Sequence, residues 1–206
     1  MLKVWGRQNS VNVQKVLWCL DEMGVAYEQI DAGMQFGVNR EPWFLAVNPN
    51  GLVPTIEHDG RMLWESNAIL RYLGSQFGRG TLCPDDPYEY AQVDMWMDWQ
   101  LGMVMPGLNP VFLGLVRTAP EKRNTAAIES GEARLIKAFA ALNERLSGRD
   151  YIVGTGLTIA DISIGCAINR WYLLDIKRPD YPHLRAWFAR ISQRPMFKKN
   201  VPADLS

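Results

Sequence analysis

The chain has 206 residues, of which 48% are hydrophobic and 21% are charged, and its 22 Lys and Arg residues balance 22 Asp and Glu residues. This composition is typical of a globular protein that buries a sizeable core, in one large domain or two small ones. A formally neutral chain with no long basic run lacks the phosphate attraction that nucleic-acid binding requires. We therefore expect no nucleic-acid partner.

The sequence also argues against a membrane span, a metal site and a hydrolytic triad. It has no run of about 18 consecutive apolar residues, and its first residues lack the apolar region of a secretory signal, so we expect a cytoplasmic protein. Cys19, Cys83 and Cys166 are far apart and none is close to a histidine, which predicts reduced thiols and no bound metal. With only His58 and His183 available, a Ser-His-Asp hydrolase is disfavoured.

Residues 1–80 alternate between strand and helix patterns. Strands are predicted at residues 2–5, 27–31, 53–58 and 62–64, and Asp59-Gly60 forms a hairpin turn between the last two. Apolar residues spaced i, i+3, i+4 and i+7 from Val13 to Leu20 predict a helix that ends at Gly24. A second apolar stripe predicts a helix from about Ala68 to Phe77.

The segment GRGTLCPDDP, residues 78–87, has the glycine, proline and aspartate content of a linker. After it, helical periodicity continues to the end of the chain. Helices are predicted at residues 87–105, 119–146, 159–174 and 182–193. The predicted organisation is therefore an α/β half followed by an all-helical half.

Ser10 and Asn12 lie where the first predicted helix begins. Ser and Asn are common N-cap residues, so the plainest interpretation is that one of them satisfies the free N–H groups of the first turn. The same N–H groups and their partial positive charge also favour a bound phosphate, carboxylate or thiolate. The two residues are compatible with both roles at once.

Two further junctions are candidates for ligand binding. Val53-Pro54 opens a strand, and an ordinary trans bond is the default there; a cis bond would turn the Val53 N–H and C=O outward, toward an extended peptide-like ligand. Glu65-Ser66 precedes a helix, where the plainest interpretation is a capping serine beside a solvated carboxylate. As a binding site, Ser66 and the helix start would hold a carboxylate and Glu65 an ammonium, the two charges of an amino-acid head group.

Two features of the helical half need an interpretation. Thr158 and Asp161 have the spacing of a capping box, which we interpret as structural. The segment at residues 90–105 is apolar nearly all round. Such a helix is most often buried in a core, and the alternatives are a face for a partner subunit or the wall of an apolar pocket.

The ordered set of these motifs resembles the cytosolic glutathione transferase superfamily over essentially the whole chain. The set comprises a short strand, a serine at the helix start, the segments NPNGLVP and WES, a helical second half and the T-x-x-D cap. Within the family, the WGRxxSxNVxKV start and the LVRTAPE stretch look most like the bacterial GstB-like branch, which is similar to the theta and nu classes.

The resemblance implies a thioredoxin-like, glutathione-binding domain at residues 1–80 and an all-helical domain at residues 87–206 that lines a pocket for an electrophile. It also implies a homodimer, with glutathione as co-substrate and no other cofactor. Ser10 falls at the position of the catalytic serine, helped by Asn12. The residues at glutathione-binding positions are Asn39, Arg40, Val53, Pro54, Glu65, Ser66 and Asp98. Those expected in the electrophile pocket are Trp99, Met103 and Phe112.

The resemblance also implies a role for each glutathione-binding position. Val53-Pro54 matches the cis-proline site that pairs with the cysteinyl part of glutathione, and Glu65-Ser66 holds the γ-glutamyl head group. Arg40, or alternatively Asn39, holds the glycyl carboxylate. Asp98 reaches the γ-glutamyl group bound by the other subunit.

The expected chemistry is nucleophilic attack by the thiolate of glutathione. A free thiol has a pKa of about 8.5, and serine is too weak a base to take its proton, so we expect Ser10 to donate a hydrogen bond to the sulfur. The expected substrates are small electrophiles, with α-halo acids or amides as candidates. The alternatives are a glutathione-dependent disulfide reductase or peroxidase, which Ser10 in place of cysteine disfavours, and a non-catalytic module that binds glutathione or apolar ligands.

Overall fold

The computed structural model describes residues 1–205, and its N-terminal half is built on a four-stranded sheet. The strands are β1 (Leu2–Trp5), β2 (Tyr27–Ile30), β3 (Thr55–His58) and β4 (Arg61–Trp64), in the order β2-β1-β3-β4. Strand β1 is parallel to β2 and antiparallel to β3, with Val4 opposite both Gln29 and Ile56. All four predicted strands are confirmed. β3 begins after Pro54, which cannot donate to the sheet.

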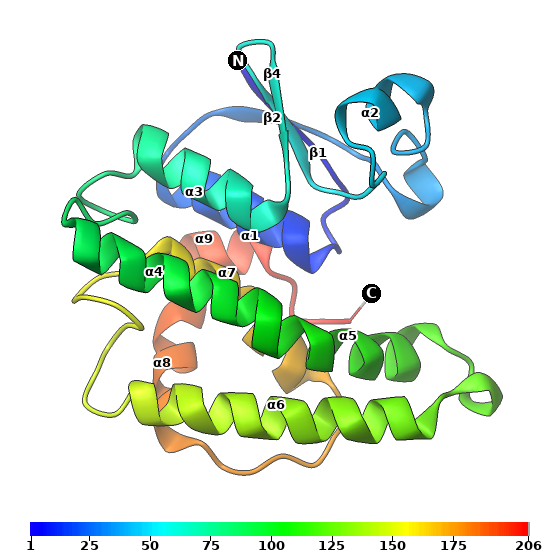
Figure 1. Ribbon diagram of the computed structural model, residues 1–206, viewed down its shortest axis with the longest axis vertical. Coiled ribbons are helices and arrows are strands. Elements are labelled where there is room, and N and C mark those ends of the chain that lie inside the picture. The colour runs from blue at the N-terminus through cyan, green and yellow to red at the C-terminus, as the bar shows by residue number, and fades with distance from the viewer. Residues whose placement is uncertain (206) are drawn as a thin grey trace.

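Two helices, α1 (Val11–Glu22) and α3 (Ser66–Phe77), lie side by side between the sheet and the helical half (Figure 1). Helix α1 packs against α7 as well as α3, and nine of its residues are buried, including Lys15. The segment between β2 and β3 holds a short 3-10 helix, η1 (Met34–Phe36), and α2 (Pro42–Val47). These two short helices lie to one side of the sheet (Figure 1).

The second half begins with one long helical run that the sequence analysis ended too early, at residue 105. Helix α4 (Pro87–Trp99) continues through the π-helical stretch η2 (Gln100–Val104), α5 (Met105–Phe112) and a second π-helical stretch, η3 (Leu113–Arg117). Pro106 has no N–H to donate to the preceding turn. The helical run nevertheless continues past it, and Arg134 Nη2 of the neighbouring helix donates to the Gly102 carbonyl at 2.8 Å.

The remaining elements complete the helical half. They are the 3-10 helix η4 (Pro120–Lys122) and helices α6 (Thr125–Arg145), α7 (Ile159–Leu173), α8 (Pro182–Ser192) and α9 (Pro195–Asn200). The predicted capping box at the start of α7 is confirmed, because the Thr158 N–H and hydroxyl both donate to Asp161 at 2.9 Å. Asp161 also accepts from Trp187 Nε1 at 2.8 Å, so the buried cap joins α7 to α8.

The helical run Pro87–Arg117 is the single helix within residues 1–205 that is long and apolar enough to cross a membrane by length and composition alone. Its most apolar 18-residue window has a mean hydropathy of 1.2, and a third of that window is buried. The run packs against α6 and α7 as a core helix does. Several of its large apolar side chains remain exposed, among them Met95, Leu101 and Met103.

Helices α5 and α6 approach most closely at two glycines. A Cβ atom on Gly131 would lie 2.7 Å from the Gly107 carbonyl oxygen, and one on Gly107 would lie 2.9 Å from that of Gly131. Both contacts are with backbone, which cannot move aside without shifting a helix. The position of α5 therefore depends on the absence of side chains here.

We expect Gly131→Ala to lower the free energy of unfolding by about 1–3 kcal/mol, because the added methyl group overpacks the α5–α6 contact. Urea denaturation followed by circular dichroism measures this. Gly102→Ala is the matched control, since a Cβ there meets nothing within 4 Å; it should be neutral or stabilise by up to about 1 kcal/mol. Equal effects of the two substitutions would contradict the close approach.

Candidate active site

A cavity of about 940 Å³ is lined by residues of both halves of the molecule. From the N-terminal half come Ser10, Asn12, Asn39, Arg40 and Val53. A smaller cavity, of about 70 Å³, shares Asn12 and Val53 with it and is also lined by Pro54, Glu65 and Ser66. The structure therefore brings together the predicted catalytic pair and six of the seven predicted glutathione-binding residues.

Ser10 is the N-cap residue of α1 by position, but its hydroxyl does not cap the helix. Its φ of −88° and ψ of 119° are extended, and its carbonyl accepts the Gln14 N–H at 2.9 Å. The side chain makes no capping hydrogen bond and is 8% exposed on the wall of the larger cavity. The hydroxyl is thus left available to a ligand at the start of α1.

The starts of α1 and α3 are linked by a side-chain hydrogen bond. Ser66, the first residue of α3, donates through Oγ to Asn12 Oδ1 at 3.3 Å. Glu65 precedes it with a φ of +70°, a left-handed conformation that is uncommon for a residue other than glycine. The Glu65 side chain makes no capping bond. Two helix N-termini, each with free N–H groups, therefore meet beside the two cavities.

The Val53–Pro54 peptide bond is cis, as the resemblance implies, so the trans bond that the residues alone favour is wrong. Asn39 and Arg40, the two alternatives for one carboxylate, differ in their contacts. Asn39 Nδ2 donates to the Gly51 carbonyl at 2.7 Å, whereas the Arg40 guanidinium is exposed next to Gly51. Arg40 is therefore the more available of the two.

Lys15 is a buried residue behind the site, and the sequence analysis did not single it out. Its Nζ lies 3.5 Å from Ser66 Oγ, 3.3 Å from Asn67 Oδ1 and 3.4 Å from Gln100 Oε1. The side chain is fully buried, and burial lowers the pKa of Lys15 to about 8. The apolar stripe of α1 gave no sign of this contact, because a lysine within such a stripe is ordinarily expected to reach solvent.

Arginines dominate the charge of the larger cavity. Arg7, Arg40, Arg117 and Arg170 line it, and no Asp or Glu does so among the residues that the structure describes. Burial, together with the neighbouring Arg117, lowers the pKa of Arg7. Burial also lowers the pKa of Arg170 to about 10, and Arg117 and Arg7 contribute in the same direction. The cavity is therefore a site of positive potential.

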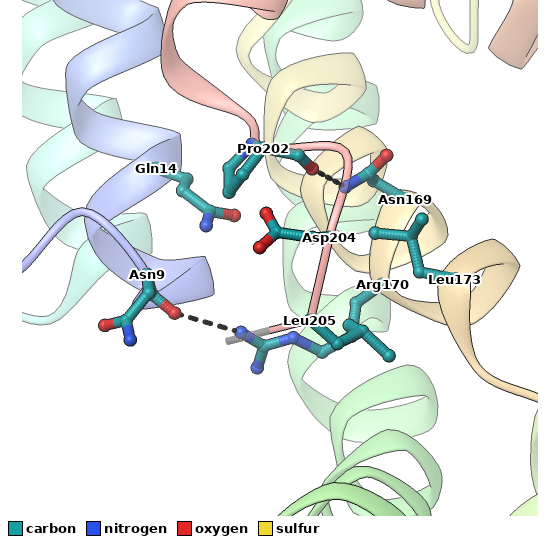
Figure 2. Close-up of a pocket in the computed structure, with 8 residues that line it drawn as sticks. All are labelled: Asn9, Gln14, Asn169, Arg170, Leu173, Pro202, Asp204 and Leu205. Atoms are coloured by element: carbon teal, nitrogen blue, oxygen red, sulfur yellow. Dashed lines mark hydrogen bonds between the residues drawn. The ribbon is translucent and has the colours of Figure 1, made fainter.

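The C-terminal segment passes beside Arg170 (Figure 2). Figure 2 shows Pro202, Asp204 and Leu205 passing beside Asn169 and Arg170. Asn169 Nδ2 donates to the Pro202 carbonyl at 2.9 Å, and Arg170 Nη2 donates to the Asn9 carbonyl at 3.4 Å. These contacts hold the guanidinium close to the strand-to-helix junction that carries Ser10.

The predicted electrophile-pocket residues are only partly brought together. Phe112 lines the larger cavity, and its ring lies under the Arg170 guanidinium at 3.9 Å. Trp99 and Met103 lie outside the cavity lining: Trp99 packs on Trp96, and Met103 is 38% exposed. The α5–η3 wall is made instead by Phe112 with Met105, Asn109, Leu113 and Arg117.

Asp98, the seventh predicted glutathione-binding residue, does not line either cavity. It is exposed on α4 and pairs with Arg71 of α3, which also pairs with Asp94. Within one chain, Asp98 thus connects α3 to α4. Its predicted contact with a ligand in another subunit is not tested by this arrangement.

Comparisons with known proteins agree with the fold. Residues 1–75 match the family described as "Glutathione S-transferase, N-terminal domain", and residues 104–195 match "Glutathione S-transferase, C-terminal domain". The chain is 39% identical to "Glutathione S-transferase GstB" of Escherichia coli strain K12 over all of both chains. It is 30% identical to "Probable elongation factor 1-gamma 1" of Arabidopsis thaliana, over 91% of this chain and 46% of that protein.

A solved structure is similar over the whole chain. It is the theta class glutathione S-transferase from the citrus canker pathogen Xanthomonas axonopodis pv. citri, with glutathione bound. The identity is 40% and the TM-score is 0.94, covering 100% of this chain and 99% of that one. The two-part fold expected from the resemblance is confirmed.

The burial of the Lys15 charge predicts how the free energy of unfolding depends on pH. Its pKa of about 8 lies below the ordinary 10.5, so the folded chain binds fewer protons than the unfolded chain between these pH values. The cost of the buried ammonium is therefore full below pH 8 and is relieved as the pH rises toward 10.5. Lys15→Met should stabilise the fold at pH 7 by about 1–3 kcal/mol.

The gain should shrink at pH 9.5, as measured by urea denaturation of both proteins at the two pH values. Thiols and phenols titrate in the same range, but they are common to both proteins and cancel in the difference. A gain that stays constant with pH, or a loss at pH 7, would show that Lys15 is not a buried cation in the folded state.

Proposed function

The chain belongs to the glutathione S-transferase family, and on that premise we propose that Ser10, helped by Asn12, activates the thiol of bound glutathione for attack on small electrophiles. The observation that carries the proposal is that the Ser10 hydroxyl, at the start of α1, makes no capping hydrogen bond. It lies on a cavity wall shared with Val53, at the cis bond, and close to the start of α3.

The tripeptide is accommodated across the two cavities. Ser66 and the N–H groups at the start of α3 hold the γ-glutamyl carboxylate, and Glu65 holds the ammonium. The backbone of Val53 pairs with the cysteinyl part. Arg40 holds the glycyl carboxylate, because the Asn39 amide already donates to Gly51. This arrangement leaves the cysteinyl sulfur at the start of α1.

Activation follows from preferential stabilisation of the thiolate. Each unit by which the thiol pKa falls requires about 1.4 kcal/mol of stabilisation of the anion relative to the thiol. One hydrogen bond to a charged group contributes about 1.5–3 kcal/mol, so the Ser10 donor accounts for about one or two pKa units. The helix start adds to this, and the proton leaves to solvent.

The arginine-lined cavity supports α-halo acids, rather than neutral α-halo amides, as the electrophiles. The Arg117 guanidinium contributes to the lowered pKa of both Arg7 and Arg170, and a carboxylate bound beside these two groups would offset that repulsion. The thiolate attacks the carbon that bears the halogen; the C–S bond forms, the carbon–halogen bond breaks and the halide leaves with the bonding electrons. The carboxylate of the halo acid remains on the glutathione conjugate.

The other activities have less support from the site. A disulfide reductase that uses its own cysteine needs a reactive thiol, but Cys19, Cys83 and Cys166 are all buried and none lines the larger cavity. Burial raises the pKa of the Cys166 thiol to about 12, which makes it a poor nucleophile. A non-catalytic binding module would not need a free hydroxyl at Ser10.

A homodimer is the expected assembly, and the cytoplasm is the expected location. The exposed apolar residues Met95, Leu101 and Met103 on the long helical run support a subunit interface, since apolar side chains so placed favour a protein partner. Asp98, on the same run, would then lie near the interface and could reach the head group bound by the partner.

We expect Ser10→Ala to raise the pKa of the bound thiol by about one or two units, because one donor to the thiolate is lost. The ultraviolet absorbance of the thiolate, titrated from pH 5 to 9.5, measures this. At pH 6.5 the conjugation rate should fall about 10- to 100-fold, while glutathione affinity changes less than about threefold. Asn12→Ala in the same titration shows how much of the shift in the thiol pKa depends on the Asn12 amide. An unshifted thiol pKa in Ser10→Ala would contradict the assignment.

The arginine cluster predicts a preference between two substrates of nearly the same shape. Arg117→Gln should lower kcat/KM for chloroacetate about tenfold and change that for chloroacetamide less than about twofold, because only the acid loses an ionic contact. Arg149→Gln, which removes an exposed arginine outside both cavities, should change neither value. Equal losses for both substrates in Arg117→Gln would argue against recognition of the carboxylate.

A further inference from the structure

The ammonium of Lys15 has no anionic partner. Its three contacts are with neutral oxygens, and no carboxylate of residues 1–205 lies within 4 Å of its Nζ. A fully buried charge is rare and costly without a partner. The fold thus retains a cation that a methionine of similar size would replace at lower cost.

The oxygens around Lys15 form a cage drawn from α3 and η2, and a residue of α7 supports it. Asn67 Oδ1 of α3 also accepts from Ser163 Oγ of α7 at 2.9 Å. Gln100 Oε1 of η2 accepts from both Lys15 and Asn67, while its Nε2 is buried without a partner. An amide held with one end unsatisfied, so that its oxygen faces the ammonium, indicates that the cage is built to keep the charge in place.

The other ionisable groups near Lys15 do not neutralise it. Glu65 attracts the ammonium but is an exposed residue. Arg170 repels it, and the Cys166 thiol, whose pKa is raised to about 12 by burial, is neutral at physiological pH. The local charge beneath Ser66 is therefore positive in the ligand-free protein.

The ammonium touches the wall of the smaller cavity but does not line it. Lys15 contacts Ser66 Oγ, and Ser66 is the residue that reaches the cavity. An anion bound at the start of α3 would lie one hydroxyl group away from the ammonium. At that depth the interaction is screened far less than one at the surface.

We propose that Lys15 is a positioning residue that supplies the counter-charge for the γ-glutamyl α-carboxylate of glutathione, acting through the Ser66 hydroxyl. The proposal rests on the proposed function, in which that carboxylate binds at the start of α3. The α-carboxylate of the bound ligand balances the positive charge of the Lys15 ammonium. It follows that the site selects for a tripeptide whose γ-glutamyl end carries the carboxylate.

The test compares two ligands that differ only in that carboxylate. One is S-methylglutathione, and the other is S-methyl-4-aminobutyryl-cysteinylglycine, in which hydrogen replaces the α-carboxylate; the methyl group removes any contribution from thiol ionisation. Calorimetry should show that Lys15→Met weakens binding of the first about tenfold and of the second less than about twofold. With glutathione as substrate, KM should rise about tenfold while kcat stays within about threefold.

Lys3→Met is the matched control, because it removes the same charge from the sheet, where Lys3 pairs with Glu57; it should leave both affinities unchanged. Equal weakening of both ligands by Lys15→Met would reveal a merely structural role and overturn the proposal, as would no weakening of either. If the wild-type protein bound neither ligand, the proposed function itself would fail.

A second variant tests the same counter-charge while Lys15 is retained. Gln100→Glu places a carboxylate within reach of the ammonium, so the cage is neutralised from inside and Lys15 is retained. The same selective weakening of S-methylglutathione is expected. Unchanged selectivity in a folded Gln100→Glu variant would overturn the proposal.

Discussion

Helix α1 is buried between the sheet and the helical half, and the contacts of its one buried lysine join the parts of the molecule that make the site. Lys15 lies one turn into the helix, where it meets Ser66 and Asn67 of α3 and Gln100 of η2. The same helix begins with Ser10 at the cavity wall. A displacement of α1 would therefore move the Ser10 hydroxyl and the buried charge beneath Ser66 together.

The site separates its charges in a way that the overall composition conceals. In the proposed arrangement, Arg40 and the two helix starts hold the tripeptide, whereas Arg7, Arg117 and Arg170 line the space left for the electrophile. Arg7, Arg117 and Arg170 come from three distant segments of a chain whose formal net charge is zero. Only the fold brings them together, and the aromatic ring of Phe112 keeps one of them in place.

The sequence was sufficient for features with a local cause. The period-2 and period-3.6 patterns predicted every strand and most helices, and the Thr158–Asp161 spacing predicted a cap that the structure contains. The residue types at the Ser10 and Ser66 junctions favoured capping, and only the family resemblance implied binding positions there; the structure places both residues on cavity walls. These features depend on residues close together in the chain.

Features that depend on tertiary contacts could not be predicted from the sequence. Pro106 should end a helix, but the helical run continues past it, and an arginine of α6 donates to the Gly102 carbonyl in the preceding turn. The run becomes π-helical at η2, which its periodicity did not indicate, and Met105 rather than Met103 lines the cavity. Lys15 is buried because α1 is covered on two sides, which its own amphipathic pattern did not indicate.

Proton release on binding tests the central claim, a thiolate stabilised at the start of α1, most directly. Glutathione and S-methylglutathione would be titrated into the wild-type protein at pH 7 by calorimetry, in buffers with different enthalpies of ionisation. If the bound thiol is ionised, glutathione releases most of one proton more than its S-methyl derivative does. Equal proton release by the two ligands would mean that the bound thiol keeps its proton, and would contradict the account.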